Sequence, residues 1–196
     1  YSASQTSQND NNQNLTYTSL DTSINNTYAS LSTAKGSFGK ILDSYSRAFR
    51  WASDRVLRSP EGGVVSFVSN SGFIDSRSFD GFRKSITKEF HHIYCYNLRG
   101  NSRTSGDSAR REGGNVFDVR VGIGVLLLVK EPGPVPTSGG ELHYRAMGDY
   151  LSKEEKIEIL SSGSTLDTLD QTEWQTIIPN KHGDWINQRS DNYMSL

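Results

Sequence analysis

Apolar residues recur at helical spacing in two segments of the chain, and polar, glycine-rich sequence separates these segments from short apolar runs. Residues 41–57 place apolar side chains on one helical face, and Ser-Pro-Glu-Gly-Gly at 59–63 ends that helix. A second helix is predicted from about Asp75 to Phe90, with its phenylalanines on one side. The face of the first helix consists of Ile41, Tyr45, Ala48, Phe49, Ala52 and Val56.

Four runs rich in β-branched and aromatic residues are typical of strands. They cover residues 64–68, 92–98, 121–130 and 141–147. The sequence Ser152-Lys153-Glu154-Glu155 resembles a capping box and predicts a short helix that ends near Leu160. Alternating helices and strands indicate an α/β sheet. No helix separates the two late strands, so an antiparallel addition at one edge of the sheet is expected.

The two ends of the chain give weaker patterns. Twenty of the first thirty residues are Ser, Thr, Asn or Gln, so residues 1–40 are expected to form a polar loop or insertion. A short helix can form there, because Ile24 and Tyr28 follow helical spacing. Residues 161–196 are mixed and are interpreted as a linker, with possible anchors at Trp174, Ile177, Ile178 and Trp185. The α/β core is therefore assigned to residues 41–160.

Composition excludes several classes of protein. Hydrophobic residues make up 34% of the 196 residues and the net charge is -1, so any DNA contact must come from a local patch. No apolar run approaches the roughly 20 residues that span a bilayer, and no membrane partner is expected. The single cysteine, Cys95, fits a reducing cytoplasm and a buried thiol. The histidines lack ligand spacing with Cys95 or on a helix face, so no metal site is predicted. They are His91, His92, His143 and His182.

Five motifs spread over nearly the whole chain carry a resemblance to a known family. The motifs are Asp43-Ser44-Tyr45-Ser46-Arg47-Ala48-Phe49-Arg50-Trp51-Ala52, Gly72-Phe73-Ile74-Asp75, Asn97-Leu98-Arg99-Gly100-Asn101, Arg110-Arg111-Glu112-Gly113-Gly114-Asn115-Val116-Phe117 and Gly148-Asp149-Tyr150-Leu151-Ser152. The chain resembles the DNA adenine methyltransferases of restriction-modification systems, and among these the methyltransferase region of Type ISP enzymes. The resemblance implies the C-terminal half of a Rossmann-like sheet, with helices on its faces and an antiparallel edge.

Type ISP enzymes are single bacterial polypeptides with nuclease, helicase-like ATPase, methyltransferase and target-recognition parts. The resemblance therefore implies double-stranded DNA and these other domains as partners, with residues 161–196 leading toward target recognition. It also implies S-adenosyl-L-methionine (AdoMet) as the cofactor. The glycine-rich AdoMet motif precedes this region in the family, so the main cofactor site is expected outside the chain. The chain alone is accordingly expected neither to bind AdoMet tightly nor to turn over.

Two aromatic residues match positions that contact a flipped adenine in this family. Family members carry Asn-Pro-Pro-Tyr, and Tyr1 is expected to be that tyrosine. Phe117, in Gly-Asn-Val-Phe ahead of a strand, matches an aromatic that packs against the extruded base; a core position is the alternative. Tyr45 and Phe49 lie on the helix that can contact the cofactor adenine in the family, again with core packing as the alternative.

A polar, arginine-rich loop follows the second strand. Its guanidinium groups, beside small and hydroxyl-bearing residues, suit contacts with DNA phosphates; a solvated surface loop is the alternative. The candidates for DNA contact are Arg99, Asn101, Arg103, Arg110 and Arg111.

Two further classes of function stay open. The first is a non-catalytic DNA-binding or structural module within a larger DNA-processing protein. The second is an unrelated α/β binding protein, which predicts a self-contained sheet. An open sheet edge and an accessible Phe117 ring favour the methyltransferase interpretation, whereas a closed fold with that ring inside it would exclude this interpretation.

Overall fold

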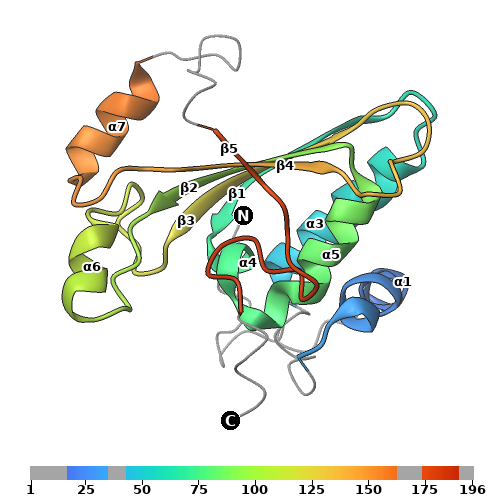
Figure 1. The fold of residues 1–196 in the computed structure, drawn as a ribbon, viewed down its shortest axis with the longest axis horizontal. Helices are drawn as coiled ribbons and strands as arrows, with labels where there is room; N and C mark the ends of the chain where they lie inside the picture. The colour runs from blue at the N-terminus through green and yellow to red at the C-terminus, as the bar shows by residue number, and fades with distance from the viewer. Residues whose placement is uncertain (1–16, 35–42, 163–173, 190–196) are drawn as a thin grey trace.

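The structure is a computed structural model of the chain and describes residues 17–34, 43–162 and 174–189. A five-stranded sheet crosses the molecule, and most of the helices lie on one side of it (Figure 1). The helices are α1 (Thr18–Ile24), η1 (Asn25–Ala29), α3 (Ser44–Leu57), α4 (Gly72–Asp75), η2 (Arg77–Phe79), α5 (Asp80–Glu89), α6 (Gly106–Glu112) and α7 (Lys153–Ser161). The strands are β1 (Gly63–Asn70), β2 (His92–Arg99), β3 (Ile123–Lys130), β4 (Glu141–Ala146) and β5 (Gln175–Ile177).

The sheet has the strand order β1-β3-β2-β4-β5. β3 pairs antiparallel with both β1 and β2, β2 pairs parallel with β4, and β4 pairs antiparallel with β5. The mixed α/β sheet with an antiparallel edge is thus confirmed, and both edge strands, β1 and β5, pair antiparallel. The late strand β3 instead lies inside the sheet. This placement pairs both edges of the most apolar strand, whose Leu126 and Leu128 are fully buried.

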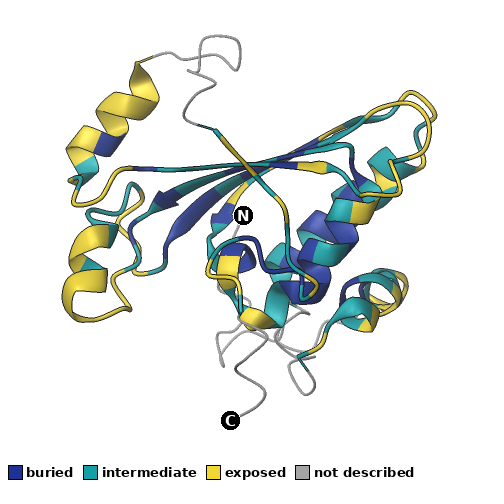
Figure 2. Cartoon of the chain, viewed as in Figure 1, coloured by how far each residue is buried: buried dark blue, intermediate teal, exposed yellow. Residues whose placement is uncertain are grey.

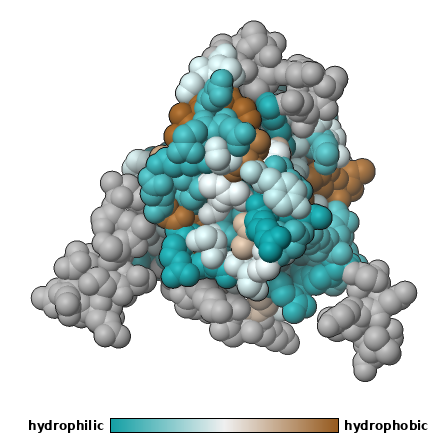
Figure 3. Space-filling view, turned by 90° about the vertical axis from the view of Figure 1, so that its left-hand side faces the viewer, coloured by the Kyte–Doolittle hydropathy of each residue, from teal (hydrophilic) through white to brown (hydrophobic). Residues whose placement is uncertain are grey.

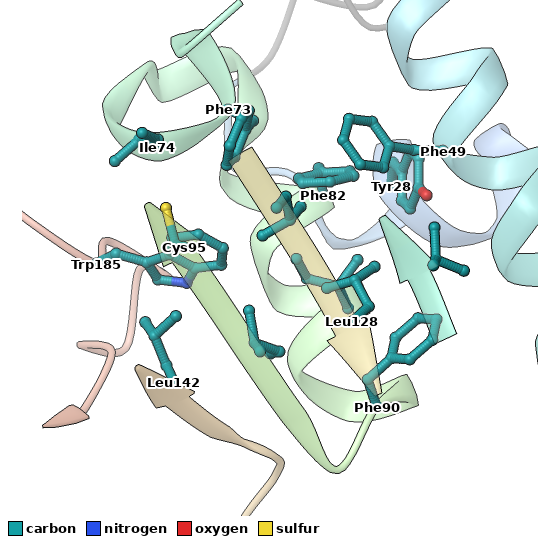
Figure 4. Packing of buried hydrophobic residues seen from close by; sticks show 14 of the residues in the cluster. Tyr28, Phe49, Phe73, Ile74, Phe82, Phe90, Cys95, Leu128, Leu142 and Trp185 are labelled. Carbon is teal, nitrogen blue, oxygen red and sulfur yellow. The ribbon is translucent and has the colours of Figure 1, made fainter. Parts of the chain in front are cut away.

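The main core lies between one face of the sheet and the helices α3, α4 and α5 (Figure 2). Because side chains alternate along a strand, Val65, Leu128 and Ile93 stand next to one another on that face. Helices contribute rings to the same core: the centroids of Phe49 and Phe82 lie 5.2 Å apart, edge to face. Figure 4 shows these rings gathered with Tyr28 and Phe73, while Trp185 lies nearer Cys95 and Leu142.

Residues 17–34 belong to this core, although the sequence indicated a polar insertion. Ile24 and Tyr28 are fully buried, and the Tyr28 ring meets Phe82 at 5.0 Å. Gly81 on α5 permits this packing, since a Cβ atom there would lie 1.8 Å from the Tyr28 carbonyl oxygen. The predicted short helix is therefore present, and it covers α5 rather than standing apart.

Residues 174–189 also contribute to the core, although the sequence indicated a linker there. Trp185 is 2% exposed and packs against Phe73 at 6.4 Å between ring centroids. The fully buried Arg83 binds this segment, because its Nε donates to the Gly183 carbonyl (2.7 Å) and its Nη2 faces Asp184 (3.5 Å). Isolated core residues of this kind leave no periodic pattern in the sequence, which explains why the segment was interpreted as a linker.

The helices that cover the main core, α3, α4 and α5, all lie on one face of the sheet and leave the opposite face free of them (Figure 1). Val64 and Val68 on β1 are 57% and 53% exposed on that face. Within the described residues, β1 pairs with β3 on one side and its other edge is open. An open edge is the arrangement expected of a half-sheet. Among the described helices, none is long and apolar enough to cross a membrane.

Candidate functional site

The parallel strands β2 and β4 end side by side, close to residues 100–122, at the end of the molecule that carries α6 and α7 (Figure 1). Figure 3 looks onto this end, and most of its described surface is hydrophilic. Ligands in open α/β sheets bind outside the carboxyl ends of the strands. A cleft of about 380 Å³ lies here. Its lining consists of Arg99, Tyr144, Arg145, Ala146, Met147, Gly148, Asp149 and Gln175.

One amide side chain organises the turn beside this cleft. The Asn115 Nδ2 group donates to the carbonyl oxygens of Gly100 (3.0 Å) and Val121 (2.8 Å). Its Oδ1 atom accepts hydrogen bonds from the backbone N–H groups of Phe117 (2.9 Å) and Val119 (3.3 Å). These four bonds join the residue after β2, the residues ahead of β3 and the turn itself, so Asn115 positions the turn.

Phe117 stands at the surface on this turn. Its side chain is 58% exposed, and Val119 two residues later is 43% exposed. The structure therefore excludes the alternative of a core residue for Phe117. Asp118, with a positive φ of 56°, forms an ion pair with Lys153 at the start of α7. A large aromatic ring without apolar cover, on a braced turn, suits contact with a flat partner.

A buried ammonium group fastens the turn to α7. Lys156 is fully buried, and its Nζ donates to the carbonyl oxygens of Leu98 (3.0 Å), Glu112 (2.7 Å) and Gly114 (2.8 Å). All three ammonium hydrogens are used, and burial lowers the pKa of Lys156. Lys156 thus connects β2, α6 and the turn.

The arginines of this region form two groups. Arg99 is paired with Asp149, and Arg111 lies 3.1 Å from Asp107 and 3.9 Å from Asp149. These two guanidinium groups are therefore committed to carboxylates of the protein. Arg103 and Arg110 are exposed, and no ion pair joins either to an acidic group within the described ranges.

The other predicted site residues have different positions. Asn101 is half-buried, and its Oδ1 accepts the Arg103 N–H at 3.1 Å, so the side chain supports the loop. Phe49 is 3% exposed among core rings, which agrees with the packing alternative and argues against contact of this ring with a cofactor. Tyr45 is half-buried on α3. Tyr1 lies outside the described residues.

Three features of this structure were not predicted from the sequence. Asn115 and Lys156 act through backbone carbonyls that lie up to 58 residues away along the chain. The register of β2 and β4 also brings His92, Glu141 and His143 together. An asparagine two residues before an exposed aromatic indicates an Asx-type turn, and this pattern could have identified Asn115.

The chain is similar to solved structures of much larger proteins. It shares 40% identity, at a TM-score of 0.84 over 93% of its length, with the ATP-dependent Type ISP restriction-modification enzyme LlaBIII bound to DNA. It shares 42% identity, at a TM-score of 0.83 over 96% of its length, with a nuclease-deletion mutant of the Type ISP enzyme LlaGI in complex with a DNA substrate mimic. A DrdV–DNA complex matches 98% of the chain at 40% identity and a TM-score of 0.82.

The match covers only part of each relative. The chain spans 12% of the LlaBIII chain, 14% of the LlaGI chain and 18% of the DrdV chain. No protein-family model and no curated protein matches it. Identity of 40% or more across almost the entire chain, together with a shared fold, indicates common descent. The chain is therefore homologous to a segment of the Type ISP restriction-modification enzymes.

Proposed function

We propose that the chain is part of a DNA adenine methyltransferase within a Type ISP restriction-modification polypeptide. In this proposal the intact enzyme transfers a methyl group from AdoMet to the exocyclic amino group of a flipped adenine. The amino group is inaccessible inside the duplex, so the base must leave the stack and be held outside it. The described residues contribute to that holding step, through the exposed ring of Phe117.

The observation that carries the proposal is the exposed, positioned ring of Phe117. Its backbone N–H is fixed by Asn115, and its side chain remains 58% exposed. Stacking of an aromatic ring on a base contributes about 1–3 kcal/mol. The open edge of β1 agrees with a sheet that other strands of the intact polypeptide complete. Similarity to Type ISP enzymes solved with DNA supports the same assignment.

The described residues do not fit an AdoMet site. Phe49, one of the two candidates, is enclosed by Phe67, Phe73 and Phe82, so its ring offers almost no surface to a ligand. The half-buried Tyr45 alone cannot form a cofactor pocket. We therefore assign AdoMet binding to other parts of the intact polypeptide. Tyr1 remains the predicted second stacking residue.

Contact with the DNA backbone is assigned to Arg103 and Arg110. Arg103 lies in the loop between β2 and α6, and Arg110 lies in the last turn of α6, ahead of the Phe117 turn. Both residues are exposed. Arginines that already pair with Asp149, such as Arg99, are better explained as supports of the loop. Phosphate contacts position a protein on the duplex without reading its sequence, so this assignment predicts no particular DNA target.

The test replaces Phe117 by alanine in the intact restriction-modification polypeptide. Methylation of a DNA duplex with AdoMet should slow by about 5- to 150-fold, which corresponds to the loss of one stacking contact. Fluorescence of 2-aminopurine at the target adenine should fall in the complex, because the flipped base loses its support. Phe117→Trp should keep most of the activity.

The matched control is Val119→Ala, which alters an exposed apolar residue on the same turn. This control should methylate DNA at the normal rate. Equal rates for Phe117→Ala and the unaltered enzyme would refute the role of Phe117. Absence of any AdoMet-dependent methylation by the intact, DNA-binding polypeptide would favour the non-catalytic module instead.

A further inference from the structure

Two histidines and a glutamate meet at the opposite end of β2 from the Phe117 turn. His92 is the first residue of β2 and lies in register with Glu141, the first residue of β4. His143 follows Glu141 by two residues, so both side chains leave the same face of β4. This face is opposite the one that packs against α3, α4 and α5. The seven-residue step from His92 to Arg99 spans roughly 23 Å of strand, so the cluster is separate from the proposed base site.

The three side chains have the geometry of a ligand set. The distance from His92 Nδ1 to Glu141 Oε2 is 3.6 Å, and the distance from His143 Nε2 to the same oxygen is also 3.6 Å. One ligand atom from each of the three residues lies within 4.8 Å of the others. Hydrogen bonds between such atoms are shorter, at about 2.7–3.2 Å. A zinc ion about 2.0–2.2 Å from each ligand in a tetrahedron separates them by roughly 3.3–3.5 Å.

The two ring nitrogens of His92 face different carboxylates, and Nδ1 is the one directed at Glu141. His92 Nε2 lies 3.2 Å from Oε1 of Glu131, and a carboxylate can only accept a hydrogen bond. In the neutral tautomer that makes this bond, the proton is on Nε2 and the lone pair of Nδ1 faces Glu141. Metal-binding histidines commonly donate their second N–H to a carboxylate in this way.

Both nitrogens that face Glu141 lack another partner. His92 Nδ1 and His143 Nε2 are shielded from solvent and accept or donate no hydrogen bond among the described residues. Shielded polar atoms are normally satisfied, and leaving one unpaired costs about 1–3 kcal/mol. The His143 ring is held in place by stacking on Tyr94, with 4.6 Å between ring centroids. A bound cation would satisfy both nitrogens at once.

We propose that His92, Glu141 and His143 bind a divalent first-row transition metal, for which Zn²⁺ is the best match. Two imidazole nitrogens and one carboxylate oxygen suit this class, whereas Mg²⁺ and Ca²⁺ require sets of six or more oxygens. Three protein ligands leave a fourth position for water. The ion joins the starts of β2 and β4, and it stabilises the pairing of β4 with the rest of the sheet.

The experiment titrates Zn²⁺ into the untagged, chelator-treated chain by calorimetry. We expect one equivalent to bind at micromolar protein concentration, Co²⁺ to give a visible absorption spectrum of a low-coordinate site, and Mg²⁺ not to bind. Zn²⁺ should also raise the Tm, since it binds the folded chain. Absence of stoichiometric Zn²⁺ binding, or equal binding of Mg²⁺, would overturn the proposal.

Substitutions locate the site. His92→Gln and His143→Gln should each weaken Zn²⁺ binding at least 100-fold and abolish the Tm shift, and Glu131→Ala should weaken binding about 10- to 100-fold. Glu141→Gln is the variant least able to disturb folding, because the Glu141 side chain is 66% exposed. His182→Gln removes an imidazole elsewhere and should bind normally. Unchanged affinity in Glu141→Gln and His143→Gln would show adventitious binding and refute the site.

Discussion

The helix-covered face of the sheet and the end that carries residues 99–122 are stabilised by different interactions. The first region consists of rings and aliphatic side chains, such as Phe82 and Leu128, that are fully buried. The second region is held by single polar side chains, Asn115 and Lys156, that bind several backbone groups each. Burial stabilises in proportion to the apolar area removed from water, whereas a hydrogen bond also fixes the relative orientation of its donor and acceptor. The polar end can therefore present an apolar ring to a partner without losing its own shape.

Removing a phenylalanine ring from each region gives the largest predicted difference in the free energy of unfolding. Phe82→Ala should lower the free energy of unfolding by about 3–5 kcal/mol, because Phe82 is fully buried among other rings. Phe117→Ala should change it by less than about 0.5 kcal/mol, since that ring is exposed. Urea unfolding of the chain measures both. Comparable losses in the two variants would show that the Phe117 turn is part of the folding core.

Asn115→Ala should lower the free energy of unfolding by about 1–3 kcal/mol. The substitution leaves backbone groups at both ends of the turn without partners. Amide hydrogen exchange at residues 117–121 should also accelerate, while exchange in β3 stays slow. Asn26→Ala, an exposed position on η1, is the control and should leave both measurements unchanged. Unaltered exchange in Asn115→Ala would contradict the positioning role.

Acid should weaken the covered region through Asp184. Hydrogen bonds from Arg189 and Asn180 outweigh desolvation and hold the pKa of Asp184 well below its ordinary value of 3.8. Its stabilising contribution is complete above the unfolded-state pKa, near 4, and is lost as the pH falls below that value. Asp184→Asn should remove up to about 1.4 kcal/mol per pH unit of this dependence, measured as urea midpoints between pH 5 and pH 2. The exposed Asp107→Asn should keep the dependence of the unaltered chain; identical curves for Asp184→Asn would contradict the assignment.

The smallest effect on folding is expected for Arg103→Ala and Arg110→Ala. Each should alter stability by less than about 0.5 kcal/mol, since both side chains are exposed. In the intact polypeptide, each should reduce the salt dependence of DNA affinity by about one unit of log–log slope. Arg111→Ala, which removes an arginine already paired with Asp107, should reduce it less. Salt slopes that change for Arg111 alone would reverse the assignment of the two arginine groups.

Local patterns predicted most of the elements. The helix over 41–57 and the strands at 64–68, 92–98, 121–130 and 141–147 all have counterparts, in α3 and in β1 to β4. Their periodicity follows from burial on one face, so it is visible in a single sequence. The helix α6, within the expected polar loop, was missed because its seven residues include no buried side chain.

Long-range features were the ones that the sequence did not reveal. The position of β3 between β1 and β2 depends on which strands pair, and apolar runs do not encode that choice. Trp185 is a possible anchor from the sequence alone, but its packing against Phe73 depends on the fold. The meeting of His92 with His143 requires the register of β2 and β4, since the residues lie 51 positions apart. Charge alone also did not separate Arg99 from Arg103, whose difference is a neighbouring carboxylate.

The ammonium group of Lys156 couples the position of α7 to the position of the Phe117 turn. Its three hydrogen bonds connect α7 to the backbone, so a displacement of α7 also displaces the carbonyl groups of Leu98, Glu112 and Gly114. The outer surface of α7 carries Ile157, Ile159 and Leu160, each between 38% and 43% exposed. A neighbouring domain that binds this surface of α7 would therefore move the Phe117 turn together with the helix, without contacting the Phe117 ring.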